Sequence, residues 1–190
     1  MKKILMMVVL VMGLQIVHAQ TEKGNVIIGA QLANIGADLK DGGSMLNFTL
    51  SPKVGWFVKD DLALGARADF GVTATKGNKP FFDLGLVPFA RYYFGGYDGP
   101  DKVKTARVFG ELGAGFGLKS SNGVSTSGFK GNAGVGVAYF VSPTVALETS
   151  ANLGILAGSG NTTVSPNINL GFQIHLPNNR VKEIRSDIRK

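Results

Sequence analysis

Regular alternation of apolar and polar residues is the feature that most constrains this chain. Near the C-terminus, five apolar residues alternate with polar residues or glycine without a break, and these are Ile168, Leu170, Phe172, Ile174 and Leu176. The same period of two runs through residues 46–56 and 62–73. This period is typical of β-strands with two unlike faces. Since no helical period is found before residue 177, we expect an all-β fold.

Eight such segments can be traced, separated by turn-forming sequences such as Asp41-Gly42-Gly43 and Ser121-Asn122-Gly123. The expected strands cover residues 25–37, 45–57, 62–75, 81–94, 104–119, 128–140, 144–157 and 164–176. Each is long enough to cross a bilayer when tilted, and an even number suits a closed antiparallel barrel. The sequence therefore predicts an eight-stranded antiparallel up-and-down β-barrel.

The two faces of these strands differ in charge. One face is apolar and almost uncharged, with Lys104 at a strand edge as the main exception. The other face carries nine charged residues, which are Lys53, Arg67, Asp69, Asp83, Arg91, Arg107, Glu111, Lys130 and Glu148. A soluble ligand-binding barrel, the alternative, would turn the apolar face inward. The strand length favours the reverse, a transmembrane barrel with the apolar face toward lipid and the charges in the lumen.

Aromatic residues gather near alternate turns. If both ends of the barrel domain lie on one side of the membrane, the turns at 58–61, 95–102 and 141–143 lie at the same end. The aromatic residues close to these turns are Trp56, Phe57, Tyr92, Tyr93, Phe94, Tyr97, Tyr139 and Phe140. Aromatic side chains are enriched at membrane–water interfaces. We therefore expect an aromatic girdle at this end of the barrel.

The N-terminus has the organisation of a secretory signal peptide. Lys2 and Lys3 precede the apolar run 4–17, and Val17-His18-Ala19 offers a small-residue cleavage site. We expect a signal peptide over 1–19, a barrel domain over 20–176 and a basic C-terminal tail over 177–190. The chain carries 20 basic and 13 acidic residues. Export from the cytoplasm argues against nucleic acid as the partner of this positive charge.

Little in the chain points to catalysis. It has no cysteine, so a disulfide framework and a thiol nucleophile are excluded. His175 is the single histidine after residue 19, and no metal-ligand or triad spacing surrounds it. The glycine-rich segment 113–117 lies within an expected strand, with no helix after it to bind phosphate. We therefore expect no catalytic, cofactor-binding or metal-binding residues, and a protein that is not an enzyme.

Several segments resemble the small outer-membrane β-barrel proteins, the porin-like family with eight-stranded barrels of the OmpA/OmpX type. They are Ser51-Pro52-Lys53-Val54-Gly55-Trp56-Phe57, Leu62-Ala63-Leu64-Gly65, Pro88-Phe89-Ala90-Arg91-Tyr92-Tyr93-Phe94 and Gly134-Val135-Gly136-Val137-Ala138-Tyr139-Phe140. The resemblance implies a location in the outer membrane, with the lipid bilayer and the barrel assembly machinery as partners, but no single activity. Barrels of this family often end on an aromatic residue, whereas fourteen residues follow Leu176 here.

The charged face suggests how the lumen is filled. An eight-stranded barrel is just wide enough inside for side chains to fill it. Lys53 and Arg67 flank the 58–61 turn and should face each other, so acidic groups must reach them, and Glu111 and Glu148 are the expected partners. We predict a side-chain-plugged polar lumen in a protein with a structural or surface-interaction role. A narrow porin for small ions or solutes is the alternative.

Overall fold

The computed structural model describes residues 21–40, 43–75, 79–95, 106–121, 124–158 and 161–178. Within them lie eight strands. They are β1 (Val26–Lys40), β2 (Gly43–Lys59), β3 (Leu62–Thr75), β4 (Phe81–Tyr93), β5 (Ala106–Ser121), β6 (Val124–Phe140), β7 (Val145–Gly158) and β8 (Asn161–Leu176). In the part of the chain that is described, no helix is long and apolar enough to cross a membrane.

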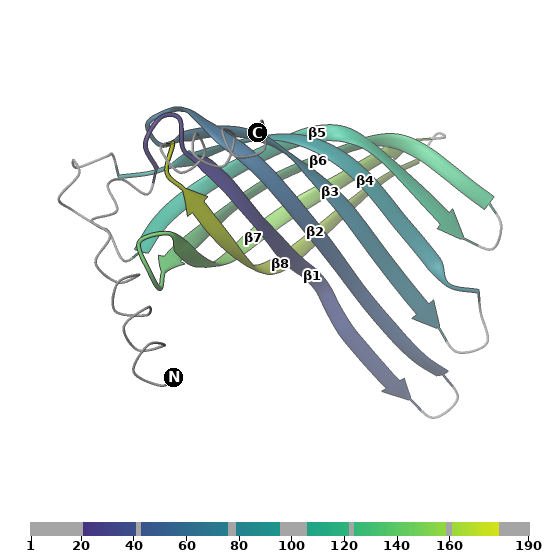
Figure 1. The fold of residues 1–190 in the computed structure, drawn as a ribbon. Helices are drawn as coiled ribbons and strands as arrows, with labels where there is room; N and C mark the ends of the chain where they lie inside the picture. The colour runs from purple at the N-terminus through teal and green to yellow at the C-terminus, as the bar shows by residue number, and fades with distance from the viewer. Residues whose placement is uncertain are drawn as a thin grey trace, which may run out of the picture.

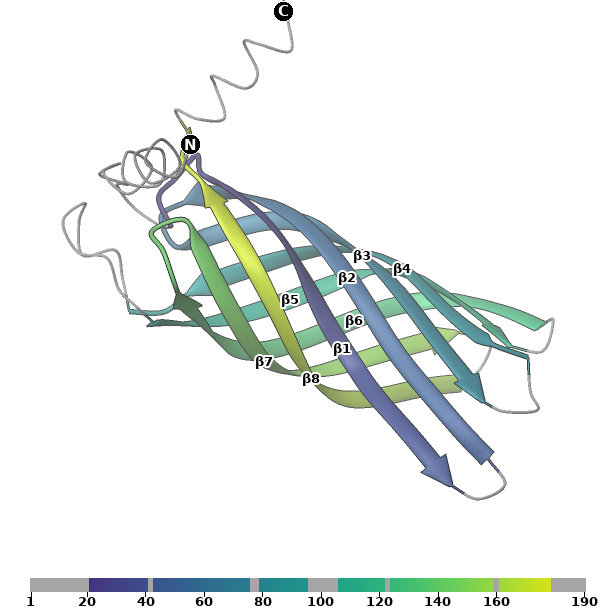
Figure 2. The same cartoon turned by 60° about the horizontal axis from the view of Figure 1, so that its bottom comes forward.

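The strands close into a barrel in sequence order. Each strand pairs antiparallel with the next, and β1 closes the barrel by pairing antiparallel with β8, with Val26 opposite Leu176. Figures 1 and 2 show the strands crossing the barrel obliquely, with the start of β1 and the end of β8 at the same end. We call this the terminal end and the opposite one the hairpin end. The prediction of an all-β, eight-stranded antiparallel up-and-down barrel is confirmed.

Several strands are longer at the hairpin end than the sequence predicts. β6 begins at Val124 rather than 128, β8 at Asn161 rather than 164, and β5 continues to Ser121. The paired residues there are mostly polar, as in Gly158 opposite Asn161. Antiparallel pairing needs only backbone groups, so it continues after the apolar alternation has ended. The predicted signal peptide 1–19, Tyr97, Lys104 and tail residues 179–190 lie outside the described residues.

The barrel is apolar on the outside and charged on the inside, which is the reverse of a soluble barrel. Large apolar side chains are exposed on the outside, and the exposed fraction reaches 65% for Leu112, 71% for Ile168 and 78% for Phe116. The inside holds most of the buried charged groups, among them Lys53 and Arg91, whose exposed fractions are 4% and 0%. Such an arrangement is stable where the outer surface meets hydrocarbon rather than water.

Candidate functional site

Five charged side chains from five strands meet in the middle of the lumen. We call Lys53, Arg67, Arg91, Glu111 and Glu148 the central ion-pair cluster. The Glu111 carboxylate lies 3.3 Å from Lys53 Nζ, 3.1 Å from Arg67 Nη1 and 2.7 Å from Arg91 Nη2. Glu148 lies 3.6 Å from Lys53 Nζ and 2.5 Å from Arg91 Nη1. The cluster thus joins β2, β3, β4, β5 and β7 across the barrel.

Strand register explains why this cluster forms. Lys53 on β2 is directly opposite Arg67 on β3, a pairing of like charges that is unfavourable by itself. Arg91 on β4 is directly opposite Glu111 on β5, which brings the carboxylate inward. Glu111 then reaches both cations of the β2–β3 pair from β5, which β4 separates from β3. Glu111 thus lies close to both cations, as the sequence suggested, whereas Glu148 is placed next to Lys53 and Arg91.

A second group of charges lies toward the hairpin end. Lys130 Nζ is 3.0 Å from Asp69 and 2.9 Å from Asp83. Asp69 also accepts a hydrogen bond of 2.8 Å from Arg67 Nε, which connects this rim group to the central ion-pair cluster. The side chains of Lys130 and Asp83 are 18% and 25% exposed to solvent. The rim group is therefore wetter than the central cluster.

The remaining charge, Arg107, lies at the terminal end and has a partner that the sequence analysis missed. Its Nη2 is 2.8 Å from Asp61 Oδ1, and its Nη1 donates a 2.6 Å hydrogen bond to Thr21 Oγ1. Asp61 lies in the β2–β3 turn with a φ of 64°, where alternation of faces no longer assigns a direction. The sequence signal for this pair was Arg107 itself, because a buried arginine in the lumen needs an acidic partner. The backbone N–H of Asp61 donates to the Thr21 carbonyl at 2.9 Å, which holds the segment before β1 against this end.

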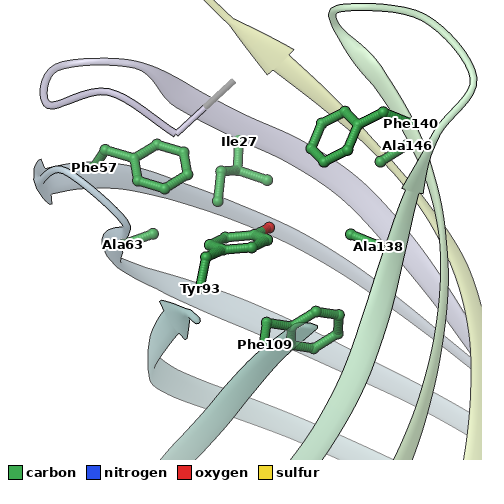
Figure 3. Close-up of a cluster of buried hydrophobic side chains, with 8 residues drawn as sticks. All are labelled: Ile27, Phe57, Ala63, Tyr93, Phe109, Ala138, Phe140 and Ala146. Atoms are coloured by element: carbon green, nitrogen blue, oxygen red, sulfur yellow. The ribbon is translucent and has the colours of Figure 1, made fainter. Parts of the chain in front are cut away.

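Aromatic and aliphatic side chains lie in the lumen between Arg107 and the central cluster. Figure 3 shows them pointing into the barrel from strands on opposite sides. We call this set the apolar plug, and it consists of Ile27, Phe57, Ala63, Tyr93, Phe109, Ala138, Phe140 and Ala146. His175 lies beside it, with its ring centre 5.1 Å from that of Phe140. Arg91 links the two layers, because its guanidinium lies 3.8 Å from the Phe109 ring centre and donates to the Tyr93 hydroxyl at 3.2 Å.

The predicted aromatic girdle needs a correction. Trp56, Tyr92, Phe94 and Tyr139 lie on the outside with exposed fractions from 46% to 53%. Phe57, Tyr93 and Phe140 instead lie in the lumen and belong to the apolar plug. Neighbouring residues on a strand point to opposite faces, so Tyr92, Tyr93 and Phe94 cannot all face lipid. An outer girdle could therefore be formed only by the four outward residues of the seven described.

All nine charged residues predicted for the lumen lie inside the barrel, divided among three levels. The central cluster holds five, the rim group adds Asp69, Asp83 and Lys130, and Arg107 lies at the terminal end. With Asp61 included, the paired groups comprise five basic and five acidic residues. Lys119, which the sequence analysis missed, also lines the lumen at the hairpin end, and its Nζ lies 5.9 Å from the Phe81 ring centre. Groups of three or more metal-ligating side chains are absent from the described ranges. The apolar plug and the dry central cluster thus lie at successive levels of the lumen.

Comparisons with known proteins bear on the fold. No family model and no curated protein sequence matches the chain. Among solved structures, the crystal structure of Neisserial surface protein A (NspA) matches with a TM-score of 0.56 and 16% identity, covering 79% of this chain and 95% of that chain. The crystal structure of the outer membrane protein OprG from Pseudomonas aeruginosa matches with a TM-score of 0.56 and 15% identity, covering 83% and 99%. The resemblance to small outer-membrane barrels is thus confirmed at the level of the fold.

Proposed function

We propose that this chain is a non-enzymatic integral protein of the outer membrane, with a structural or surface-interaction role and a lumen closed by its own side chains. The observation that carries the proposal is the central ion-pair cluster, in which the side chains of Lys53, Arg91 and Glu148 are no more than 1% exposed. An aqueous path for ions along the axis would wet these groups. Their dryness supports a plugged barrel.

The outer surface supports the location in a membrane. Its exposed Leu, Ile, Val and Phe side chains would be unfavourable in water, at roughly 25 cal/mol per Å² of apolar surface. The closed barrel leaves no strand edge with unpaired backbone groups, which is a requirement for crossing hydrocarbon. The similarity in fold to the outer membrane protein OprG agrees with this location. The bilayer is then the partner of the outer face, and insertion by the barrel assembly machinery follows from the same proposal.

Single-channel recording of the refolded protein in a planar bilayer tests the closed lumen. The native barrel should insert without resolved conductance steps. A variant that removes parts of both layers, Tyr93→Ala/Phe109→Ala/Glu148→Gln, should pass ions, because it shortens two plug side chains and discharges one carboxylate of the central cluster. Asp83→Asn at the wet rim is the matched control and should stay closed.

A narrow porin is the alternative function, and the same single-channel recording distinguishes it from a closed barrel. The observation that favours it is the polar cavity at the hairpin end, about 330 Å³ in volume. Regular conductance steps from the native protein would establish a porin and overturn the plug. Silence of the native barrel together with steps from the triple variant would support the plugged lumen.

A further inference from the structure

The cavity at the hairpin end is a second feature of the lumen, distinct from the two layers that close it. It measures about 330 Å³, and its walls come from β1 to β8. Arg67 and Asp69 form its floor above the central cluster, while Thr73 and Phe81 lie near its mouth, where the β3–β4 hairpin begins and ends. We call it the vestibule. Its volume is at the lower end of the range for ligand pockets, about 300–1,000 Å³.

Asparagine side chains form a large part of the polar lining of the vestibule. Five of them line it, and they are Asn47, Asn132, Asn152, Asn167 and Asn169. Three have a buried amide atom with no hydrogen-bond partner among the described residues, namely Asn47 Oδ1, Asn132 Nδ2 and Asn169 Oδ1. Asn169 has an exposed fraction of only 9%, and it lies on β8, which is separated by β7 from the β6 strand that carries Asn132. Buried amide groups normally have partners, so these atoms point to a ligand.

Four of the five charged groups that line the vestibule, Arg67, Asp69, Asp83 and Lys130, are paired with one another, while the fifth, Lys119, lies with its Nζ 5.9 Å from the Phe81 ring centre. Arg67 lies 2.8 Å from Asp69, and Lys130 bridges Asp69 and Asp83 at 3.0 and 2.9 Å. An ionic solute would have to compete with these pairs. The unpartnered amides need a neutral solute that both donates and accepts hydrogen bonds, as hydroxyl groups do. Because exchanging the amide O and N swaps a donor for an acceptor at one place, a hydroxyl fits either orientation.

We propose that the vestibule binds a small uncharged solute with several hydroxyl groups, of the size of a monosaccharide. Asn47, Asn132 and Asn169 hydrogen-bond its hydroxyls, and the plugged layers below make the vestibule a dead end. The inference rests on the proposed function only for the side of entry, since termini on the periplasmic side place the mouth of the vestibule outside the cell. Binding itself requires the folded barrel alone.

The test uses ¹⁵N-labelled refolded protein in detergent micelles, titrated with glucose while the side-chain amide signals are followed by NMR. The signals of Asn47, Asn132 and Asn169 should shift together and saturate, with a dissociation constant of about 1–10 mM, since few hydrogen bonds are formed. Asn47→Leu and Asn169→Leu should each weaken binding about threefold to tenfold. Asn178→Leu, at the terminal end, is the matched control and should leave the affinity unchanged.

The glucose titration of the native protein needs no variant. It therefore tests the vestibule site even if a substitution prevents folding. Absence of a saturable shift at these three asparagines would overturn the site. Sodium glutamate should leave the three signals in place, and a stronger response to glutamate than to glucose would overturn the assignment of a neutral ligand. The two proposals fail separately. A native barrel that conducts and still binds glucose overturns the closed lumen alone, whereas a silent barrel without the glucose response overturns the vestibule site alone.

Discussion

At the scale of single residues, the stability of the barrel interior depends on how completely each buried charge is paired with opposite charges. Glu111 contacts three cations, and its side chain is only 3% exposed. Water cannot easily replace a lost partner in such a place, so the removal of one acid leaves buried positive charge uncompensated. Asp83 makes one ion pair with Lys130, and its side chain is 25% exposed. The same chemical group should therefore matter very differently at the two depths.

Replacement of Glu111 by alanine should lower the free energy of unfolding by about 3–5 kcal/mol, the usual cost of breaking a buried pair. Asp83→Ala is the matched control and should cost about 0–1 kcal/mol, because water screens the remaining lysine. Urea unfolding of the refolded barrel in detergent, followed by circular dichroism, measures both. Equal shifts of the two urea midpoints would show that depth in the lumen does not govern the strength of these pairs.

At the scale of elements, the close approach of β2, β3 and β4 depends on glycine. Gly55 and Gly65 are directly opposite each other on the lumen side, and the Phe89 ring lies over both. A Cβ at Gly65 would lie 2.7 Å from Gly55 Cα and 2.7 Å from Phe89 Cζ, closer than van der Waals contact allows. Among the described residues, the nearest atom to a Cβ at Gly154 on β7 would be Ser165 O, at 3.6 Å. Glycine is thus required at one of these positions and replaceable at the other.

Gly65→Ala should destabilise the barrel by about 1–3 kcal/mol, because the added methyl group forces β2 or Phe89 to move. Gly154→Ala should be neutral or stabilising by about 0.4–1 kcal/mol, because alanine restricts the unfolded chain and fits the folded one. Thermal or urea unfolding of the two variants beside the native protein measures the difference. Destabilisation of similar size in both would contradict the close packing of Phe89 on Gly65.

Alternation along the strands allowed the fold class and the inward direction of the nine charges to be predicted from sequence. It could also have divided the aromatic residues, because Tyr92 and Tyr93 are neighbours on one strand. Nearness to a turn does not determine which face a side chain takes, and the predicted girdle therefore included three residues of the lumen. Asp61 could not be assigned by alternation, since it lies in a turn. The contact between Glu111 and Arg67 depends on barrel closure and shear, which local sequence does not encode.

At the scale of the whole molecule, the barrel has an apolar exterior and a charged interior. The hydrocarbon-facing band should be least tolerant of charge at mid-height. Leu170 lies near the middle of β8 and is 55% exposed, while Val164, three residues from the start of β8, is 59% exposed on the same face. The two side chains are almost equally exposed, but they lie at different heights along the barrel axis.

Leu170→Arg should cost about 2–4 kcal/mol of stability in lipid vesicles, because the guanidinium is placed in the hydrocarbon, whereas Val164→Arg near the interface should cost about 0–1 kcal/mol. Urea unfolding from vesicles, with the native protein as reference, gives both values. In detergent micelles, which adapt to the charge, the difference between the two variants should shrink. A larger cost at Val164 than at Leu170 would place the membrane at a different height.

The central claim is that the outward face of every strand contacts lipid and the inward face does not. Trp56 is the single tryptophan, so a Trp56→Phe background accepts one reporter at a time. Tryptophans placed along β8 at 167, 168, 169 and 170 should respond with a period of two in vesicles of lipids with brominated acyl chains. Strong quenching at 168 and 170, with weak quenching at 167 and 169, is the result that we expect. Stronger quenching at 167 and 169, or equal quenching at all four positions, would contradict the orientation on which the account of this barrel depends.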